Sequence, residues 1–144
     1  MVRRFFFLLF LVALPHTVSG ATLRVGMSVD YPPLTYKQEG RVVGLEVDNA
    51  RAVAELLGMQ LELVELPFTG LIPALEQGRI DVIMSGLSKT PERAERIVFV
   101  EPYLDIGQMG ITLVDKAGAF LQPWSIYREG LRVGVEPGTT GAEF

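Results

Sequence analysis

The residues best suited to chemistry lie in one segment, Met84–Arg93, which reads MSGLSKTPER. A short apolar run at 81–84 leads into a loop with two serines and a glycine, and a helix is predicted to begin at Thr90 and Pro91. Free N–H groups in such a loop and at a helix N-terminus attract anions, and the Arg93 side chain leans back towards the same place. Because a guanidinium can donate two parallel hydrogen bonds, the segment predicts recognition of a carboxylate.

The alternative for this segment is an ordinary Ser-rich turn followed by a solvent-facing arginine. A cation in the first turn of a helix opposes the helix dipole at a cost of roughly a few tenths of a kcal/mol. That mild conflict favours a functional role for Arg93, but the residue types alone leave both interpretations open.

Two further groups could contribute to a binding site. Gly138-Thr139-Thr140 follows a predicted strand and opens a predicted helix, which repeats the anion-binding pattern with two hydroxyls, although a Thr N-cap explains it as well. Tyr31 and Phe68 fall in loops at strand ends, where aromatic rings can flank an apolar ligand portion or a cation. The alternative is that these rings anchor their loops in the core.

The composition excludes several classes of chemistry. The chain has 144 residues, a length that suits one domain, or one domain and part of another. Apolar residues make up 49% and charged residues 21%, and this composition excludes a disordered chain and a basic nucleic-acid binder. There is no cysteine, hence no disulfide, thiolate zinc site or cysteine nucleophile. His16 is the one histidine, and it lies in a segment that we expect to be removed. We therefore expect no Ser-His triad, no metal site and no cofactor.

Residues 1–20 are predicted to be a secretory signal peptide. MVRR places two arginines before a ten-residue apolar run, and PHTVSGA supplies small residues for cleavage after Gly20 or Ala21. A membrane-spanning helix needs about 20 apolar residues, so an uncleaved anchor is the weaker alternative. Removal takes away two arginines and makes the mature chain more negative than the −4 of the full sequence. We expect export to the periplasm and no attraction to nucleic acid or anionic lipid.

The elements that must position the chemical groups follow a βαβ rhythm. We expect strands at 22–27, 61–64, 81–84 and 110–114, with a hairpin built from 34–36 and 42–43. We expect helices at 45–57, 71–77 and 90–96, the first with Val47, Ala50, Val53, Ala54 and Leu57 on one face. Gly58 and Gly78 are predicted to close the first two helices. Strands that alternate with helices predict an α/β fold with a parallel sheet, and ligands bind beyond the carboxyl ends of such strands.

A second lobe is predicted to begin after residue 114. Residues 115–130 resemble a loop, and LRVGV at 131–135 then repeats LRVGM at 23–27, which predicts a strand at 132–136. We therefore expect 21–114 to form one lobe and 115–144 to form a connection and the start of an incomplete second lobe. A lone strand and the first turn of a helix cannot bury a core, so we expect the sequence to be a fragment or a truncated product.

Residues 23–114 resemble the first lobe of the family 3 extracellular solute-binding proteins, the periplasmic amino-acid-binding proteins of ABC importers. The motifs that carry the resemblance are Asp30-Tyr31-Pro32-Pro33, Gly44-Leu45-Glu46-Val47-Asp48, Phe68-x-x-Leu71-Ile72-Pro73-Ala74-Leu75, Gly78-Arg79-Ile80-Asp81, Met84-Ser85-Gly86, Thr90-x-x-Arg93 and Phe99-x-x-Pro102-Tyr103. Gly138-Thr139-Thr140 matches the opening of the family's second lobe. The resemblance implies an α/β fold of the type II periplasmic-binding-protein kind, with one complete βαβ lobe and the start of a second.

The resemblance also implies a role for each candidate residue. Arg93 would bind the α-carboxylate of an amino acid, helped by Ser88 and by Thr140 beside Thr139. The carbonyl of Ser85 or Gly86 would accept a hydrogen bond from the α-ammonium, and Tyr31 and Phe68 would flank the ligand. Ser28 occupies a position that reads the ligand side chain and that can be a carboxylate in members for basic amino acids, so serine weakens the case for a Lys, Arg or His ligand.

The resemblance further implies a monomer that delivers its amino acid to an ABC permease in the membrane. In the family, a complete second lobe supplies a carboxylate for the α-ammonium and closes over the ligand by a hinge motion. Since that lobe is incomplete in this sequence, we expect residues 21–144 alone to bind amino acids very weakly or not at all.

Two other functions remain open. The fold resembles that of periplasmic cyclohexadienyl dehydratases, which need an acid at the leaving hydroxyl, and the candidate acids are Asp30, Glu101, Glu136 and Glu143. None of these acids lies in a compelling constellation. A ligand-sensing module of a receptor kinase or a peptidoglycan lyase is the other alternative.

Overall fold

A parallel sheet of three strands in the order β5-β1-β6 is the centre of the molecule. The structure, a computed structural model, describes residues 20–143, so the predicted signal peptide lies outside the described residues except for Gly20. The strands of this sheet are β1 (Thr22–Met27), β5 (Gln60–Glu65) and β6 (Val82–Ile83). β1 pairs with β5 along its whole length, and it pairs with β6 through Val25 and Gly26. The predicted α/β fold with a parallel sheet is confirmed.

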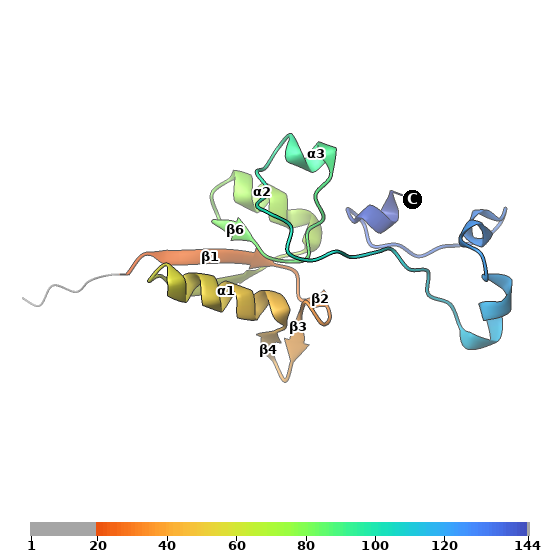
Figure 1. Cartoon of the computed structure of the whole chain (residues 1–144), viewed down its shortest axis with the longest axis horizontal. Helices are drawn as coiled ribbons and strands as arrows, with labels where there is room; N and C mark the ends of the chain where they lie inside the picture. Colours follow the sequence, from red (N-terminus) through yellow and green to blue (C-terminus); the bar gives the residue numbers. More distant parts are fainter. Residues whose placement is uncertain (1–19, 144) are drawn as a thin grey trace, which may run out of the picture.

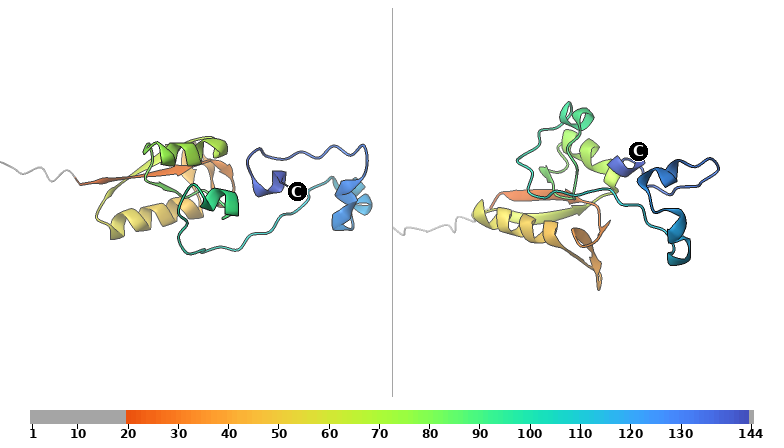
Figure 2. Two further views of the ribbon diagram at one scale, coloured as in Figure 1. Left: turned by 90° about the horizontal axis from the view of Figure 1, so that it is seen from above. Right: turned by 45° about the vertical axis from the view of Figure 1, so that its right-hand side comes forward.

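The alternation of side chains along β1 assigns a helix to each face of the sheet. Leu23, Val25 and Met27 are buried against α1 (Leu45–Leu56), where Val47, Ala50 and Ala54 complete one apolar cluster. A Cβ at Gly26 would lie on the other face of the sheet, against Ile80 and against Leu71 of α2 (Leu71–Glu76). Figures 1 and 2 show α1 on one side of the sheet and α2 on the other. A helix on each face of the sheet fits parallel strands, which are buried on both faces.

A second, smaller sheet lies beside the start of α1. It is antiparallel in the order β2-β3-β4, and its strands are β2 (Asp30–Tyr31), β3 (Thr35–Gln38) and β4 (Arg41–Val43). The predicted hairpin is confirmed as β3 and β4. The sequence did not indicate β2, which is two residues long and precedes Pro32-Pro33.

The helix ends follow the predicted signals with small shifts. α1 ends at Leu56, and Gly58 adopts a φ of 63°, which is the left-handed conformation that glycine favours. Leu57 was expected on the buried face, but it lies at the helix end and is 59% exposed, so that part of the prediction is wrong. The third helix, α3 (Pro91–Ala94), is shorter than predicted and begins after the N-cap Thr90.

From residue 95 to residue 143 the chain is extended and mostly exposed. The described structure has short 3-10 turns in this range, Val114–Ala119, Pro123–Tyr127 and Thr140–Ala142, and no strand. The predicted strands at 110–114 and 132–136 are therefore wrong for this structure. Both segments alternate apolar residues, but neither pairs with a neighbouring strand, and an isolated strand leaves its backbone groups to water. Figure 1 shows this part of the chain extending away from the sheet before its last residues turn back towards it.

Among residues 20–143, the structure contains no helix with the length and apolar character required to cross a bilayer.

Candidate ligand-binding site

A small cavity lies beyond the carboxyl ends of the three parallel strands. Its volume is about 170 Å³, and its walls come from the loops that follow β1, β5 and β6 and from residues 106–140. The residues that line it are Ser28, Tyr31, Phe68, Gly86, Ser88, Arg93, Ile106, Gln108, Glu136, Thr139 and Thr140. Every residue predicted for the site is among them except Ser85. The location is the one expected for a ligand in an open α/β sheet.

Arg93 is held in this cavity by backbone groups. Its Nη1 donates to the carbonyl oxygen of Ser88 at 2.6 Å, and its Nη2 donates to the carbonyl oxygen of Gly138 at 2.7 Å. The backbone N–H of Arg93 donates to Thr90 Oγ1 at 3.3 Å, which is the N-cap of α3. The guanidinium therefore joins the two predicted anion-binding segments, which are 45 residues apart in the sequence.

The charge of Arg93 is buried without a carboxylate partner. The residue is 9% exposed, and among residues 20–143 no ion pair to it lies within 4.0 Å. A buried charge costs free energy unless an opposite charge or hydrogen bonds compensate it. The two carbonyls use two of the five N–H groups of a guanidinium, and three remain for an anion. Arg93 therefore lies at a cavity and is shielded from bulk water.

Two aromatic residues form part of the same cavity. The Arg93 guanidinium lies over the Phe68 ring, with its carbon 5.8 Å from the ring centroid, which is within the range of a cation–π contact. Tyr31 is 41% exposed, and its ring packs near Gly86. Both aromatic residues thus line the cavity, and neither is fully buried.

Ser85 does not line the small cavity but is hydrogen-bonded to Ser28, which does. Its hydroxyl accepts a hydrogen bond from the backbone N–H of Ser28 at 2.9 Å, and its Oγ lies 3.2 Å from Ser28 Oγ. Both serines are buried. The hydrogen bond between the two serines therefore links Ser28, at the cavity, to the loop after β6.

The segment around Gly138 closes the opposite side of the cavity. Thr139 Oγ1 donates to the carbonyl of Glu136 at 2.8 Å, and Gln108 Nε2 donates to Thr140 Oγ1 at 2.9 Å. The helix predicted to open here is limited to the short 3-10 turn at Thr140–Ala142. Glu136, Thr139 and Thr140 thus line the cavity together with Arg93.

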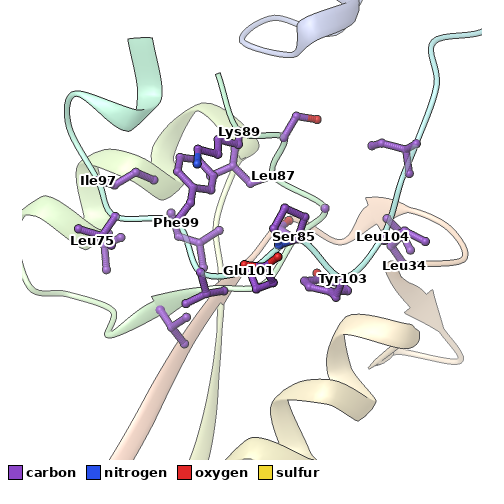
Figure 3. Close-up of a pocket in the computed structure, with 18 of the residues that line it drawn as sticks. Leu34, Leu75, Ser85, Leu87, Lys89, Ile97, Phe99, Glu101, Tyr103 and Leu104 are labelled. Carbon is purple, nitrogen blue, oxygen red and sulfur yellow. The ribbon is translucent and has the colours of Figure 1, made fainter. Parts of the chain in front are cut away.

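A larger and mostly apolar cavity adjoins the small one. It has a volume of about 430 Å³ and lies between α2, the loop after β6 and residues 97–106, as Figure 3 shows. Leu75, Ile97 and Phe99 are among its apolar side chains. Gly86 and Ser88 line both cavities, so the loop after β6 separates them.

Two pairs of charges fix the elements that carry the site. Arg24 on β1 forms a bidentate pair with Asp81 before β6, at 2.6 and 3.0 Å, and these hydrogen bonds lower the pKa of Asp81. Arg96 after α3 forms a bidentate pair with Glu76 at the end of α2, at 2.7 and 2.9 Å, and these bonds lower the pKa of Glu76. The second pair joins α2 to the chain that leaves α3, and so it restrains the helix that presents Arg93.

Sequence reasoning did not assign Ile106, Gln108 or Glu46 to the site. Ile106 and Gln108 lie in an extended stretch where no motif marked them. Glu46 belongs to the motif Gly44–Asp48, which by itself indicates only the start of a helix, yet its carboxylate accepts a hydrogen bond from the Gly86 N–H at 2.7 Å. Within the part of the chain that the structure describes, no three His, Cys, Asp or Glu residues are grouped as a metal site requires.

The chain is similar to known proteins over most of its length. The sequence profile of the bacterial extracellular solute-binding proteins, family 3, matches residues 23–135. A probable histidine-binding protein of Campylobacter jejuni is 36% identical over 118 residues, which are 82% of this chain and 45% of that protein. Cyclohexadienyl dehydratase of Pseudomonas aeruginosa is 34% identical over 132 residues, which are 91% of this chain and 49% of that enzyme. The chain thus spans about half the length of these relatives.

Solved structures resemble the chain as well. The ancestral amino acid-binding protein AncCDT-1, a precursor of cyclohexadienyl dehydratase, superposes with a TM-score of 0.83 and 36% identity over 85% of this chain and 55% of that chain. The arginine-bound form of domain 1 from TmArgBP, a T. maritima protein, has a TM-score of 0.58 and 44% identity over 59% of this chain and 68% of that domain. The chain therefore shares its fold with amino-acid-binding proteins.

Proposed function

We propose that this chain, which belongs to the bacterial extracellular solute-binding proteins of family 3, captures a polar amino acid or a similar small zwitterion without transforming it. The observation that carries the proposal is the Arg93 guanidinium, which is buried in the small cavity, has no carboxylate partner among the described residues, and keeps three N–H groups available. An α-carboxylate would supply the missing negative charge and could accept two parallel hydrogen bonds.

The α-ammonium of a zwitterion would also have hydrogen-bond and charge partners at this cavity. The carbonyl of Ser85 or Gly86 would accept a hydrogen bond from the α-ammonium, as the family resemblance implies. Glu136 lines the same cavity and is the one acidic residue among those around it, so it offers the ammonium an opposite charge. One cation and one carboxylate around 170 Å³ match the charges of a single amino acid.

The ligand side chain would lie between Tyr31 and Phe68, with Ser28 at its end. Ser28 offers a hydroxyl and no charge, which favours a neutral polar side chain. The names of the relatives point to histidine and arginine for those proteins. A panel of L-glutamine, L-histidine and L-arginine therefore separates the two expectations.

The proposal places the protein outside the cytoplasm. After cleavage of the predicted signal peptide, the protein would act as a monomer in the periplasm and deliver its ligand to an ABC permease. We expect residues 21–144 to bind weakly, and the arginine-bound form of domain 1 from TmArgBP shows that a single domain of that related protein holds its ligand. Binding by residues 21–144 is therefore a direct test of how much one lobe contributes.

The proposal is tested by calorimetric titration of the amino acids into the wild-type chain and the Arg93→Ala variant. We expect Arg93→Ala to weaken binding about a hundredfold or more, because it removes charge-assisted hydrogen bonds to the carboxylate. Phe68→Ala should weaken binding less, since the ring contributes packing and orients the guanidinium. Arg41→Ala, a change of the same charge at an exposed strand residue, is the matched control and should bind as the wild type does. An Arg93→Ala variant with unchanged affinity would reject the site.

The alternative function is that of a cyclohexadienyl dehydratase, which the relative from P. aeruginosa supports. A dehydratase needs a general acid at the leaving hydroxyl, and Glu136 is the acidic residue around the small cavity. Glu136 is exposed, whereas enzymes tune such acids by burial and by close neighbours, and so the binding function is favoured. Incubation with prephenate or arogenate and assay for an aromatic product decides between the two functions.

A further inference from the structure

Glu46 is a buried carboxylate that contacts the ligand-facing loop from behind. It lies in the first turn of α1, where a negative charge is favoured, and it is 1% exposed. Its Oε1 accepts two hydrogen bonds, from Gly86 N–H at 2.7 Å and from the Tyr103 hydroxyl at 2.5 Å. Its backbone N–H donates to the carbonyl of Leu34 at 2.9 Å. One side chain thus joins the start of a helix to two segments that are otherwise separate.

The loop that Glu46 contacts needs an external restraint. Gly86 has a φ of 61°, which is the left-handed region, and it lies against Tyr31 and Leu34 so closely that a Cβ would be 2.8 Å from Leu34 Cδ1. The N–H of Gly86 is not used by the sheet, because β6 ends at Ile83. The hydrogen bond to Glu46 therefore fixes a residue that lines both cavities.

Tyr103 extends the restraint to the chain that leaves the first lobe. The residue is 59% exposed overall, but its hydroxyl meets the buried carboxylate. Burial of that hydroxyl, together with its hydrogen bond to Glu46, raises the pKa of Tyr103, so the hydroxyl stays protonated and donates. Tyr103 precedes Ile106 and Gln108, which line the small cavity.

The geometry around Glu46 is also costly. The second oxygen, Oε2, is buried and has no hydrogen-bond partner within the part of the chain that the structure describes. An unpaired buried oxygen of a carboxylate lowers stability, so stability alone does not explain an acid at this position. A cost of this kind is typical of residues kept for function.

We infer that Glu46 is a positioning residue, which holds the Gly86 loop and the Tyr103 segment in the geometry that the ligand site requires. The inference rests on the proposed function, since it assigns Glu46 to the amino-acid site without contact with the ligand. The loop is then formed before binding, and the ligand does not have to order it. Preformed sites gain affinity because the ordering cost on binding is smaller.

The test compares the wild-type chain with Glu46→Gln, which keeps the shape and removes the charge, and with Tyr103→Phe, which removes the hydroxyl alone. Glu55→Gln is the matched control, because it removes the same charge from an exposed position on the same helix. Two quantities are measured on each protein: hydrogen exchange of the Gly86 amide by NMR, and the Kd for L-glutamine, L-arginine and L-histidine by calorimetry.

We expect Glu46→Gln to retain its circular dichroism spectrum, to speed exchange of the Gly86 amide about tenfold or more, and to weaken binding about tenfold. Tyr103→Phe should change both quantities less, by roughly threefold, and Glu55→Gln should change neither. A merely structural role would lower the free energy of unfolding but leave the Kd of the folded protein unchanged, and that result would overturn the inference.

The outcomes also separate this inference from the proposed function. If the wild type binds none of the three amino acids, the proposed function fails for them, and the Gly86 amide still decides whether Glu46 holds the loop. If Glu46→Gln does not fold, Tyr103→Phe decides, because it leaves the carboxylate in place. Unchanged Gly86 exchange in the folded variant would overturn the inference.

Discussion

Residues 20–94 and residues 95–143 differ in structure although both contain alternating apolar residues. Val25 in β1 is fully buried between two neighbouring strands and a helix, whereas Ile111 in the extended part is 97% exposed. The repeated sequence makes the contrast sharper, because LRVGM at 23–27 is a central strand and LRVGV at 131–135 is not a strand. A strand pattern therefore gives a strand only where a neighbouring strand and a covering helix are available.

The largest difference between the two regions should appear when a core side chain is shortened. Leu71 in α2 is fully buried and approaches Gly26 of β1, so Leu71→Ala leaves a cavity against the central strand. We expect the free energy of unfolding to fall by about 2–5 kcal/mol. Urea denaturation followed by circular dichroism measures it, and a loss below about 1 kcal/mol would show that α2 packs loosely on the sheet.

A glycine substitution should separate the two regions by a smaller amount. Gly44, which precedes α1, has a φ of 128°, and a Cβ there would clash with the carbonyl oxygen of Leu34. We expect Gly44→Ala to lower the free energy of unfolding by about 1–3 kcal/mol. Gly110→Ala is the matched control, because no atom lies within 4 Å of its Cβ position. Equal effects in the two variants would contradict the contrast.

The sequence was a good guide to the first region because its signals are local. The spacing of apolar residues, the proline after Thr90, and the glycines after α1 and α2 set the helix boundaries to within a few residues. β2 was missed, since two residues before a pair of prolines carry no periodic pattern. The predictions of strands at 110–114 and 132–136 are wrong because a strand also depends on neighbouring strands, which the alternation of apolar residues does not reveal.

The site was predictable where it depends on topology and less so where it depends on tertiary contacts. Arg93, Ser88 and Phe68 follow strands whose carboxyl ends meet, which is why their loops share one cavity. The hydrogen bond from Arg93 to the carbonyl of Gly138 joins segments that only the folded chain brings together. The role of Glu46 was hidden for the same reason, because Gly86 and Tyr103 are 40 and 57 residues away from it.

A pH titration sharpens the comparison through the Arg24–Asp81 pair, which belongs to the first region. The Arg24 guanidinium, through its hydrogen bonds, holds the pKa of Asp81 below its ordinary value. A carboxylate with a lowered pKa in the folded state contributes stability above the unfolded pKa and loses it as the pH falls through the folded pKa. We expect Asp81→Asn to be slightly less stable than the wild type at pH 7, and the difference to shrink below about pH 4.

The measurement for Asp81 is thermal unfolding of both proteins from pH 7 to pH 2. The effect should be smaller than that of Leu71→Ala, because the pair lies at the surface, with both side chains 36% exposed. If the difference in melting temperature between the wild type and Asp81→Asn grew towards low pH, the sign would be the reverse of the expected one, and Arg24 would be excluded as the cause.

The smallest effect is expected in the second region, from Ile111→Ala. The side chain is 97% exposed, so its removal takes almost no apolar surface out of a packed environment. We expect the free energy of unfolding to change by less than about 0.5 kcal/mol, in contrast to the loss expected for Leu71→Ala. Urea denaturation of the 144-residue chain measures both variants under the same conditions. A loss of about 2 kcal/mol or more would mean that residues 110–114 are covered in solution, and the contrast between the two regions would then be wrong.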